Sequence, residues 1–236
     1  MMRSISSQRA LWVVSFSGID GAGKSTQIQA LRTEMESAGL CVRVIAFWDD
    51  VATLTRLREV SSHSLFRGDK GVGTPAAPIV RRDKNVRSWW MVGVRLGLYL
   101  ADAVSLRCVV KKAQRSRPDV IICDRYIYDE LANLSLRWPL VRAYVRLVLK
   151  LVPKPQIRYL LDADPPAAFA RKPEYPLAFL HQCRAEYLAL AEFIGGMTVL
   201  PPAPAHQVTR EVFSYARERF DPGTSKERAQ AFPAHR

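Results

Sequence analysis

Apolar residues along the chain follow two kinds of pattern. Short continuous runs, each about the length of a buried strand, occupy residues 11–16, 40–47, 119–123, 156–161 and 197–200. Between them apolar residues recur every three or four positions, as they do after the first run at Ile28, Leu31, Met35 and Ala38. Strands that alternate with helices predict an α/β fold with a parallel sheet and right-handed connections.

Helical spacing also marks the rest of the chain. The longest pattern ends near Pro118 and consists of Trp89, Val92, Leu96, Tyr99, Ala103, Leu106 and Val110. Further helices are expected at residues 51–60, 127–150 with a break at Pro139, 177–193 and 206–220. Residues 61–85 show no sustained period, which favours a mobile loop on the substrate side. We expect one domain over residues 1–220 and a disordered basic tail at 221–236.

The first helix follows a sequence with specific chemistry. Residues 18–25 match G-x-x-x-x-G-K-[ST], the phosphate-binding P-loop, and lie between a predicted strand and a predicted helix. The glycines let backbone N–H groups surround phosphate oxygens, and the helix N-terminus favours an anion. A Gly-rich turn in an unrelated α/β protein is the alternative. Because eight positions and both flanks agree, we expect a nucleoside triphosphate to bind at Gly18, Gly21, Ala22, Gly23, Lys24, Ser25 and Thr26.

Ligands of such sheets bind at the carboxyl ends of the strands, where several charged residues are expected to converge. Lys24 would reach the β- and γ-phosphates, and Ser25 would hold Mg²⁺. Asp124 ends the third strand and would orient Mg²⁺ or its waters, with a helix N-cap as the alternative role. Arg125 would bind an acceptor phosphate, with an ion pair to Asp124 as the alternative.

Two other charged positions admit two interpretations each. Asp20 lies inside the loop, where an inward carboxylate would repel triphosphate, so we expect it to point outward, to the acceptor or to solvent. Arg171 and Lys172 form a basic cluster after the fourth strand. They either close over the γ-phosphate as a lid with an arginine finger or form a solvated basic loop.

Composition adds a net charge of +13, more than polyanionic substrates account for. The four cysteines show no metal-ligand or disulfide spacing, and Cys41 and Cys123 are expected to act as small hydrophobes in or beside buried strands. This cysteine usage, a polar N-terminus and the lack of a bilayer-length apolar stretch predict a cytoplasmic protein. Arg142, Arg146 and Lys150 form a basic stripe beside an apolar helix face. It could touch anionic lipid, but a solvated face over a core or dimer helix is favoured.

Taken together, these motifs resemble those of the thymidylate kinase family of nucleoside monophosphate kinases. The resemblance covers about residues 11–220. It rests on the P-loop with its internal Asp20, on Asp124-Arg125-Tyr126, on residues 161–166 and on Arg184 with Tyr187.

The resemblance implies a three-layer α/β/α P-loop fold with sheet order 2-3-1-4-5 and a short lid. It also implies ATP as donor with Mg²⁺, a nucleoside monophosphate as acceptor, and a homodimer formed through helices, with no specific nucleic acid. Asp20 would lie near the acceptor sugar and Arg125 on its phosphate. Because Ala22 stands where some members have arginine, the catalytic arginine would come from the lid as Arg171.

Some positions depart from the family pattern in the acceptor pocket. Asp49 and Asp50 stand in a segment that replaces an R-E-P-G-G-T-like motif, and Asp129 and Glu130 replace a Ser-Asn pair. Tyr99 could replace the stacking phenylalanine. Such a pocket would not recognise thymine in the same way, because unpaired buried polar groups are costly. A nucleoside or small-molecule kinase with Asp49 or Asp50 as general base is one alternative, and a non-catalytic nucleotide-binding or nucleic-acid-associated module is another.

Overall fold

The computed structural model describes residues 11–52 and 89–220. Five parallel strands form one sheet in the order β2-β3-β1-β4-β5. They are β1 (Trp12–Ser17), β2 (Val42–Ala46), β3 (Val120–Asp124), β4 (Ile157–Leu161) and β5 (Thr198–Leu200). The expected α/β class, parallel pairing and strand order are therefore confirmed.

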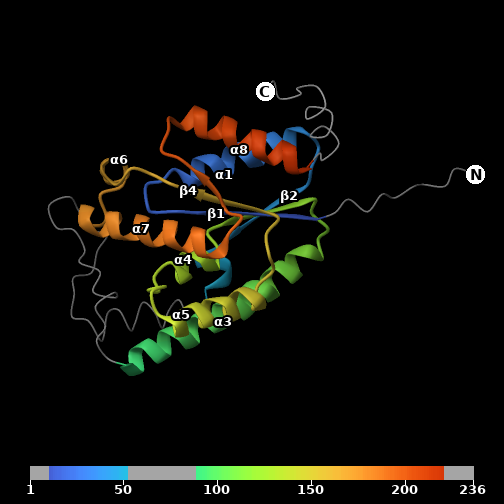
Figure 1. The fold of residues 1–236 in the computed structure, drawn as a ribbon. Helices are drawn as coiled ribbons and strands as arrows, with labels where there is room; N and C mark the ends of the chain where they lie inside the picture. The colour runs from blue at the N-terminus through green and yellow to red at the C-terminus, as the bar shows by residue number, and fades with distance from the viewer. Residues whose placement is uncertain (1–10, 53–88, 221–236) are drawn as a thin grey trace, which may run out of the picture.

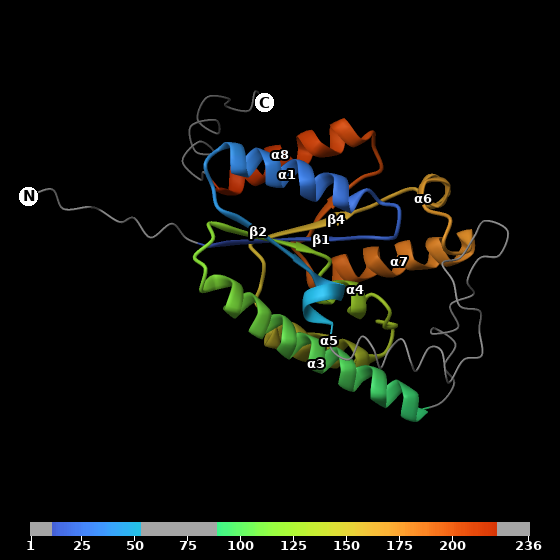
Figure 2. The same cartoon turned by 180° about the vertical axis from the view of Figure 1, so that it is seen from behind.

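Helices cover both faces of this sheet (Figure 1). One layer consists of α1 (Lys24–Ser37) and α8 (Ala205–Phe220). The opposite layer contains α3 (Trp89–Gln114), α4 (Ile127–Leu131), α5 (Pro139–Leu151) and α7 (Leu177–Ile194), as Figure 2 shows from behind. The short helix α6 (Pro165–Arg171) follows β4, and a single π-helical turn, η1 (Phe47–Val51), follows β2.

Alternating strand residues build two separate cores, because successive side chains of a strand point to opposite faces. Val13, Ile121 and Cys123 pack toward α3, α4 and α5. Val14 and Ile122 pack toward α1 and α8. Both faces of the central strands are apolar, which is why these strands read as continuous runs in the sequence.

Several local predictions can be compared with the structure. The break at Pro139 is confirmed, since α4 ends at Leu131 and Pro139 begins α5, where its fixed φ suits a first helical turn. Cys123 is buried as expected, but Cys41 is exposed, because it precedes the edge strand β2. The expected loop at 61–85 and tail at 221–236 lie outside the described residues, as does all but the start of the helix expected at 51–60.

The long helix α3 was expected to bury one apolar stripe. Tyr99, Ala103, Leu106 and Val110 are buried, whereas Val92 is 45% exposed, toward the end of α3 that extends beyond the rest of its layer (Figures 1 and 2). Among the described residues, no helix has the length and apolar character required to cross a bilayer.

Candidate active site

The P-loop runs from β1 to α1 and is held closely between two other elements. A Cβ added at Gly18 would lie 2.5 Å from the carbonyl oxygen of Leu161 at the end of β4. At Gly21, whose φ is +79°, it would lie 2.4 Å from the carbonyl oxygen of Ala168 in α6. Both positions therefore require glycine, and the loop has little room to move against β4 and α6.

The start of α1 is suited to an anion. Its N-cap is Gly23, whose backbone is left-handed, no side chain caps the helix, and the first turn contains no acidic residue. Ser25 and Thr26 are exposed there. The free N–H groups and the helix dipole thus remain directed at whatever binds before the helix.

Lys24 lies folded over the loop. Its Nζ donates hydrogen bonds to the carbonyl oxygens of Gly18 and Ile19, each at 2.8 Å, and the residue is 7% exposed. Burial, reinforced by the nearby positive charge of Arg125, lowers the pKa of Lys24 to about 8, although Asp129, Asp20 and Asp124 oppose the shift. Lys24 therefore carries a charge that its surroundings only partly compensate.

The adjacent strand β3 places Asp124 opposite Phe16 of β1. Arg125 follows with a φ of +68°, a left-handed conformation rare for a side chain of this size, and its N–H donates to the carbonyl oxygen of Phe16 at 3.0 Å. Its guanidinium contacts Asp20 and Asp129 rather than Asp124. The N-cap of α4 is Tyr126, so Asp124 does not take the alternative capping role.

Asp129 is the centre of a buried polar network. Its carboxylate accepts hydrogen bonds from Ser17 Oγ at 2.7 Å, Tyr187 OH at 2.7 Å and Arg125 Nη1 at 2.9 Å, and it is 6% exposed. Burial raises the pKa of Tyr187, and the charge of Asp129 raises it further, so its hydroxyl stays a donor. Strand β1 and helices α4 and α7 thus meet at one carboxylate.

The carboxylate of Asp20 forms an ion pair with Arg125. From the sequence we expect Asp20 to point to the acceptor or to solvent, and whether it contacts an acceptor stays a prediction. Burial alone would raise the pKa of Asp20, but Arg125, Lys24 and Lys172 outweigh it and lower the pKa below its ordinary value of 3.8. The carboxylate therefore stays ionised at neutral pH and fixes one side of the Arg125 guanidinium.

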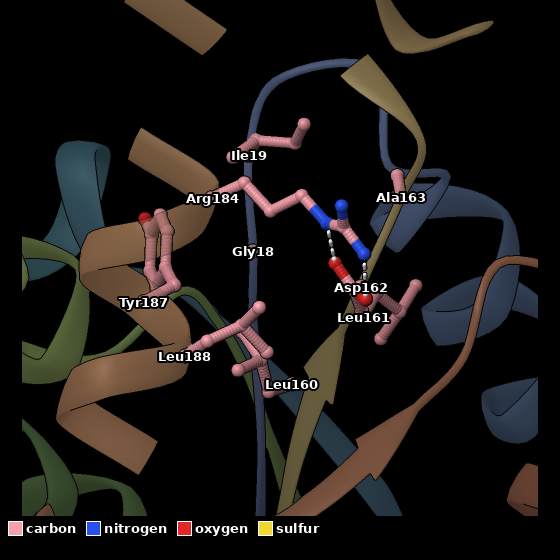
Figure 3. A pocket seen from close by; sticks show the side chains of 9 residues that line it. All are labelled: Gly18, Ile19, Leu160, Leu161, Asp162, Ala163, Arg184, Tyr187 and Leu188. Carbon is pink, nitrogen blue, oxygen red and sulfur yellow. Dashed lines mark hydrogen bonds and ion pairs between the residues drawn. The ribbon is translucent and has the colours of Figure 1, made fainter. Parts of the chain in front are cut away.

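A third ion pair, between α7 and the end of β4, lies beside the P-loop. Arg184 of α7 binds Asp162 at the end of β4 through two hydrogen bonds, Nε to Oδ1 at 2.6 Å and Nη2 to Oδ2 at 2.7 Å (Figure 3). Between this pair and Gly18 lies a small cavity that Tyr187 and Leu188 also line. The bidentate pair ties α7 to the strand against which Gly18 packs.

Comparison with known proteins identifies the family. A probable thymidylate kinase from Pyrobaculum aerophilum is 30% identical over 192 residues, which cover 75% of this chain and 82% of the relative. The chain belongs to the thymidylate kinase family. Thymidylate kinase from Xanthomonas oryzae pv. oryzae is 26% identical over 213 residues, which cover 84% of this chain and 80% of the relative.

The thymidylate kinase of Bifidobacterium longum is 28% identical over 155 residues, and the chain spans 66% of that relative's length. No family model matches the chain. The similarity is therefore not confined to the motifs but extends over most of the chain, at an identity low enough for the acceptor pocket to differ.

Three residues of the expected acceptor pocket, Tyr99, Asp49 and Asp50, lie outside the group formed by Arg125, Asp20 and Asp129. Tyr99 on α3 is 4% exposed. Burial raises its pKa, and its hydroxyl interacts with Glu130, the residue after Asp129. Asp49 is exposed on η1, while Asp50 Oδ2 accepts a hydrogen bond from the N–H of Ala46 at 2.9 Å. Neither Tyr99 nor Asp49 forms a hydrogen bond or an ion pair with Arg125, Asp20 or Asp129.

The lid region is only partly connected to the loop. Arg171 ends α6, is exposed, and forms no hydrogen bond or ion pair with another described residue. Lys172 pairs with Glu174 at 3.2 Å and is close enough to Asp20 to lower its pKa. The structure thus brings Lys24, Asp124 and Arg125 together with Asp20 and Asp129. Arg171 contacts none of them.

The oxygen donors around the loop suit the magnesium ion that the family implies. Ser25 offers an exposed hydroxyl. Asp124 offers a half-buried carboxylate that is close enough to Lys24 for its charge to act against the lowering of the lysine's pKa. Among the described residues, no cluster of three or more metal-ligating side chains occurs. One carboxylate and one hydroxyl fit Mg²⁺, which keeps several waters and takes its other ligands from phosphates.

Sequence reasoning missed how Ser17 and Tyr187 act. Ser17 directly precedes the P-loop motif, and, like Tyr187, it stands out in the sequence only through the family resemblance. Both donate to Asp129, across sequence separations of 112 and 58 residues. Only the observation that Asp129 replaces a neutral family residue could have suggested that donors must surround it.

Proposed function

We propose that this protein transfers the γ-phosphoryl group of ATP, with Mg²⁺, to a nucleoside monophosphate, in a reaction like that of dTMP kinase (dTMP + ATP → dTDP + ADP). One observation carries the proposal: the P-loop at the end of β1 lies beside Asp124 and Arg125 at the end of β3. A donor triphosphate and an acceptor phosphate would then meet at one edge of the sheet.

Each residue has a distinct part in this proposal. Lys24 exchanges its two carbonyl contacts for the β- and γ-phosphates, and the first N–H groups of α1 bind phosphate oxygens. Bound Mg²⁺, held through Ser25 and Asp124, supplies neutralisation of the phosphate charge. Arg125 orients the acceptor phosphate, and Arg171 reaches the γ-phosphate when the acceptor is in place.

A second candidate acceptor, a neutral hydroxyl compound such as a nucleoside, is favoured by the charges around Arg125. That guanidinium already contacts Asp20 and Asp129. Together with Asp124, three carboxylates accompany the two cations Lys24 and Arg125, and the nearby cation Lys172 is itself paired with Glu174. A doubly charged acceptor phosphate would have to overcome this negative excess, whereas a hydroxyl would not. A carboxylate within reach of the hydroxyl could also accept its proton.

A panel assay separates these acceptors. Purified protein with ATP and Mg²⁺ is offered each nucleoside and each nucleoside monophosphate, and ADP formation is measured. Turnover of dTMP or another monophosphate supports the first proposal, and turnover of nucleosides alone replaces it with the second. ATP binding without turnover on any acceptor would contradict both and indicate a non-catalytic module. The variant Lys24→Met controls for contaminating kinases, since it should show no turnover.

The proposed enzyme is a homodimer, as the family resemblance implies. Sedimentation equilibrium of the full chain tests this, with a mass of twice 26.6 kDa as the expected result. A concentration-independent mass of 26.6 kDa would contradict it.

A further inference from the structure

Two buried polar atoms of the central sheet lack a hydrogen-bond partner. They are Ser15 Oγ in β1 and Arg158 Nε in β4, and within the described residues no other buried side-chain nitrogen or oxygen is left without one. Ser15 is completely buried, and Arg158 is half-buried. Buried polar groups of folded proteins are almost always hydrogen-bonded, either to the protein or to a bound water or ion. Two exceptions in one sheet therefore indicate a missing partner.

The register of the sheet places these two residues next to each other. β1 and β4 are parallel neighbours, and Ser15 is paired with Arg158. Paired residues of adjacent strands point to the same face of a sheet. Val13, two residues before Ser15, packs into the core beneath α4 and α7, so Ser15 and Arg158 point to that side as well. One occupant between β1, β4 and these helices could therefore serve both atoms.

The neighbouring side chains are also hydrogen-bond donors. Burial raises the pKa of Tyr128 in α4 to about 12, and the charge of Arg158 is close enough to oppose the rise. Cys123 is paired with Ser15 across the other edge of β1, and burial raises its pKa to about 12, so it stays a thiol. Hydroxyl, guanidinium, phenol and thiol groups all have a hydrogen to donate.

No carboxylate neutralises the positive charge at this position. Within the described part of the chain, Arg158 forms no ion pair. Its Nη2 reaches the turn between α7 and β5, where a Cβ added at Gly196 would lie 2.7 Å from it. Gly196 is exposed, so the guanidinium extends from the buried Nε to the surface. A small solute thus has a route from this turn to the buried donors.

We propose that Ser15 Oγ, Arg158 Nε and Tyr128 OH bind a small inorganic anion, of the size of chloride, between β1, β4 and α4. An anion accepts hydrogen bonds from all three groups and neutralises the guanidinium. A water molecule would need acceptors for its own hydrogens and would leave the charge of Arg158 without a partner. The site therefore fits an anion better than a water, and it does not depend on the proposed phosphoryl transfer.

The anion would join the two strands that position the P-loop. β1 leads directly into Gly18, which packs against Leu161 at the end of β4. Ser17, two residues after Ser15, donates to Asp129 at 2.7 Å. An ion between β1 and β4 would stabilise this part of the sheet without contacting the nucleotide. Its effect should therefore appear in stability.

Thermal unfolding of the full chain tests the site. Tm is measured at a low and at a tenfold higher concentration of sodium chloride, with sodium gluconate keeping the ionic strength constant. Gluconate serves as the anion that is too large for the site. An anion that binds only the folded protein should raise Tm by roughly 3–6 °C for each tenfold increase above its Kd.

Two variants remove one donor each. Ser15→Ala and Arg158→Gln should each lose most of the chloride-dependent rise in Tm. Ser15→Ala removes a hydroxyl that has no partner, so it should fold and, without chloride, melt close to wild type; it decides the test if Arg158→Gln does not fold. Arg210→Gln removes an exposed arginine of α8 and is the matched control, which should keep the full rise. Lys24→Met should also keep it, so the outcome is separate from catalysis.

Bromide locates the ion directly, because it replaces chloride and scatters anomalously. Crystals soaked in sodium bromide should show an anomalous difference peak within hydrogen-bond distance of Ser15 Oγ and Arg158 Nε, and Ser15→Ala crystals should show a weaker peak or none. An equal chloride-dependent rise in wild type and Ser15→Ala, no rise in wild type, or a water at this position in the bromide soak would overturn the proposal.

Discussion

At the residue scale, the charged side chains of the candidate site differ in whether an opposite charge pairs with them. Arg125 is held by two carboxylates, and Asp129 is held by three side-chain donors. Lys24 has only carbonyl partners and a lowered pKa. A bound triphosphate would therefore give Lys24 the negatively charged partner that it lacks, whereas Arg125 already has two.

Neutralising the buried Asp129 should lower the stability of the protein more than neutralising the exposed Glu36. Asp129→Asn removes a buried charge and leaves Arg125 with one fewer partner, so the free energy of unfolding should fall by about 3 kcal/mol. Glu36→Gln is the control, because it breaks an exposed ion pair with Arg32 and should cost less than about 1 kcal/mol. Urea denaturation of both variants measures the difference. Similar losses in both would show that the Asp129 network contributes no more than a surface pair.

The lowered pKa of Lys24 should make triphosphate binding depend on pH. As pH rises through about 8, the free protein loses the ammonium charge, so affinity for a non-hydrolysable ATP analogue should fall. Calorimetry between about pH 6.5 and about pH 9.5 tests this, with Lys24→Met as a weak and pH-independent control. A wild-type affinity that stays constant over this range would contradict the prediction.

The lowered pKa of Lys24 also affects stability. Its contribution to the free energy of unfolding changes with pH in the direction opposite to the change in ATP affinity. Between about 8 and the ordinary lysine pKa of 10.5, the unfolded chain binds the Lys24 proton more strongly than the folded chain does. The contribution of Lys24 to the free energy of unfolding therefore rises with pH over this interval.

These residue-scale contacts were the least predictable from sequence. The motif placed Lys24, Asp124 and Arg125 at one edge of the sheet, because strand ends converge there. It could not show that Arg125 pairs with Asp20 and Asp129 instead of Asp124. Those pairs depend on the left-handed backbone of Arg125 and on where α4 begins, which are set by packing rather than by local sequence.

At the element scale, the P-loop is shaped by its neighbours as much as by its own sequence. Gly18 lies against β4 and Gly21 against α6. A motif match records that glycine is present, but not which neighbouring backbone excludes a Cβ. The order of elements was predictable from periodicity, and Pro139 marked the break before α5, since proline suits the first helical turn. The exposure of Cys41 could not be predicted, because the sequence does not show which strand forms the edge of the sheet.

Gly21 and Gly39 allow two effects of replacing a glycine by alanine to be told apart, steric crowding and backbone strain. Gly21 and Gly39 have nearly the same φ, +79° and +77°, but a Cβ at Gly39 would meet nothing within 4 Å. Gly21→Ala should therefore weaken ATP binding roughly tenfold or more by moving the loop away from Ala168, whereas Gly39→Ala should lose about 1 kcal/mol of stability and keep its affinity. Calorimetry and urea denaturation of both variants measure the two effects. If both variants bound ATP like wild type, close packing against α6 would not matter for the loop.

The end of α6 provides the second prediction at this scale. Arg171 is exposed and has no partner among the described residues, so Arg171→Ala should not disturb the fold. If Arg171 contacts the γ-phosphate only during transfer, kcat should fall by roughly a thousandfold while ATP affinity changes little. Arg210→Ala on α8 is the control for losing an exposed arginine. An unchanged kcat would remove Arg171 from the proposed mechanism.

At the scale of the whole molecule, the P-loop joins parts that are distant in sequence. β1, β4, α1 and α6 all contact it directly, and α7 reaches it through Tyr187 and the Arg184 pair. The parallel class followed from alternating patterns, but the strand order came only from the family resemblance, since periodicity does not specify which strands are neighbours.

Because these elements meet at the loop, ligand binding should stabilise the molecule as a whole. At an ATP concentration of about one hundred times Kd, binding adds about 2.7 kcal/mol, which for a chain of this length corresponds to a rise in Tm of roughly 5–10 °C. Differential scanning calorimetry with ATP and Mg²⁺ measures the shift. It should shrink when EDTA replaces Mg²⁺ and disappear in Lys24→Met. A full shift in Lys24→Met would mean that the nucleotide binds elsewhere, and the P-loop would lose its assigned role.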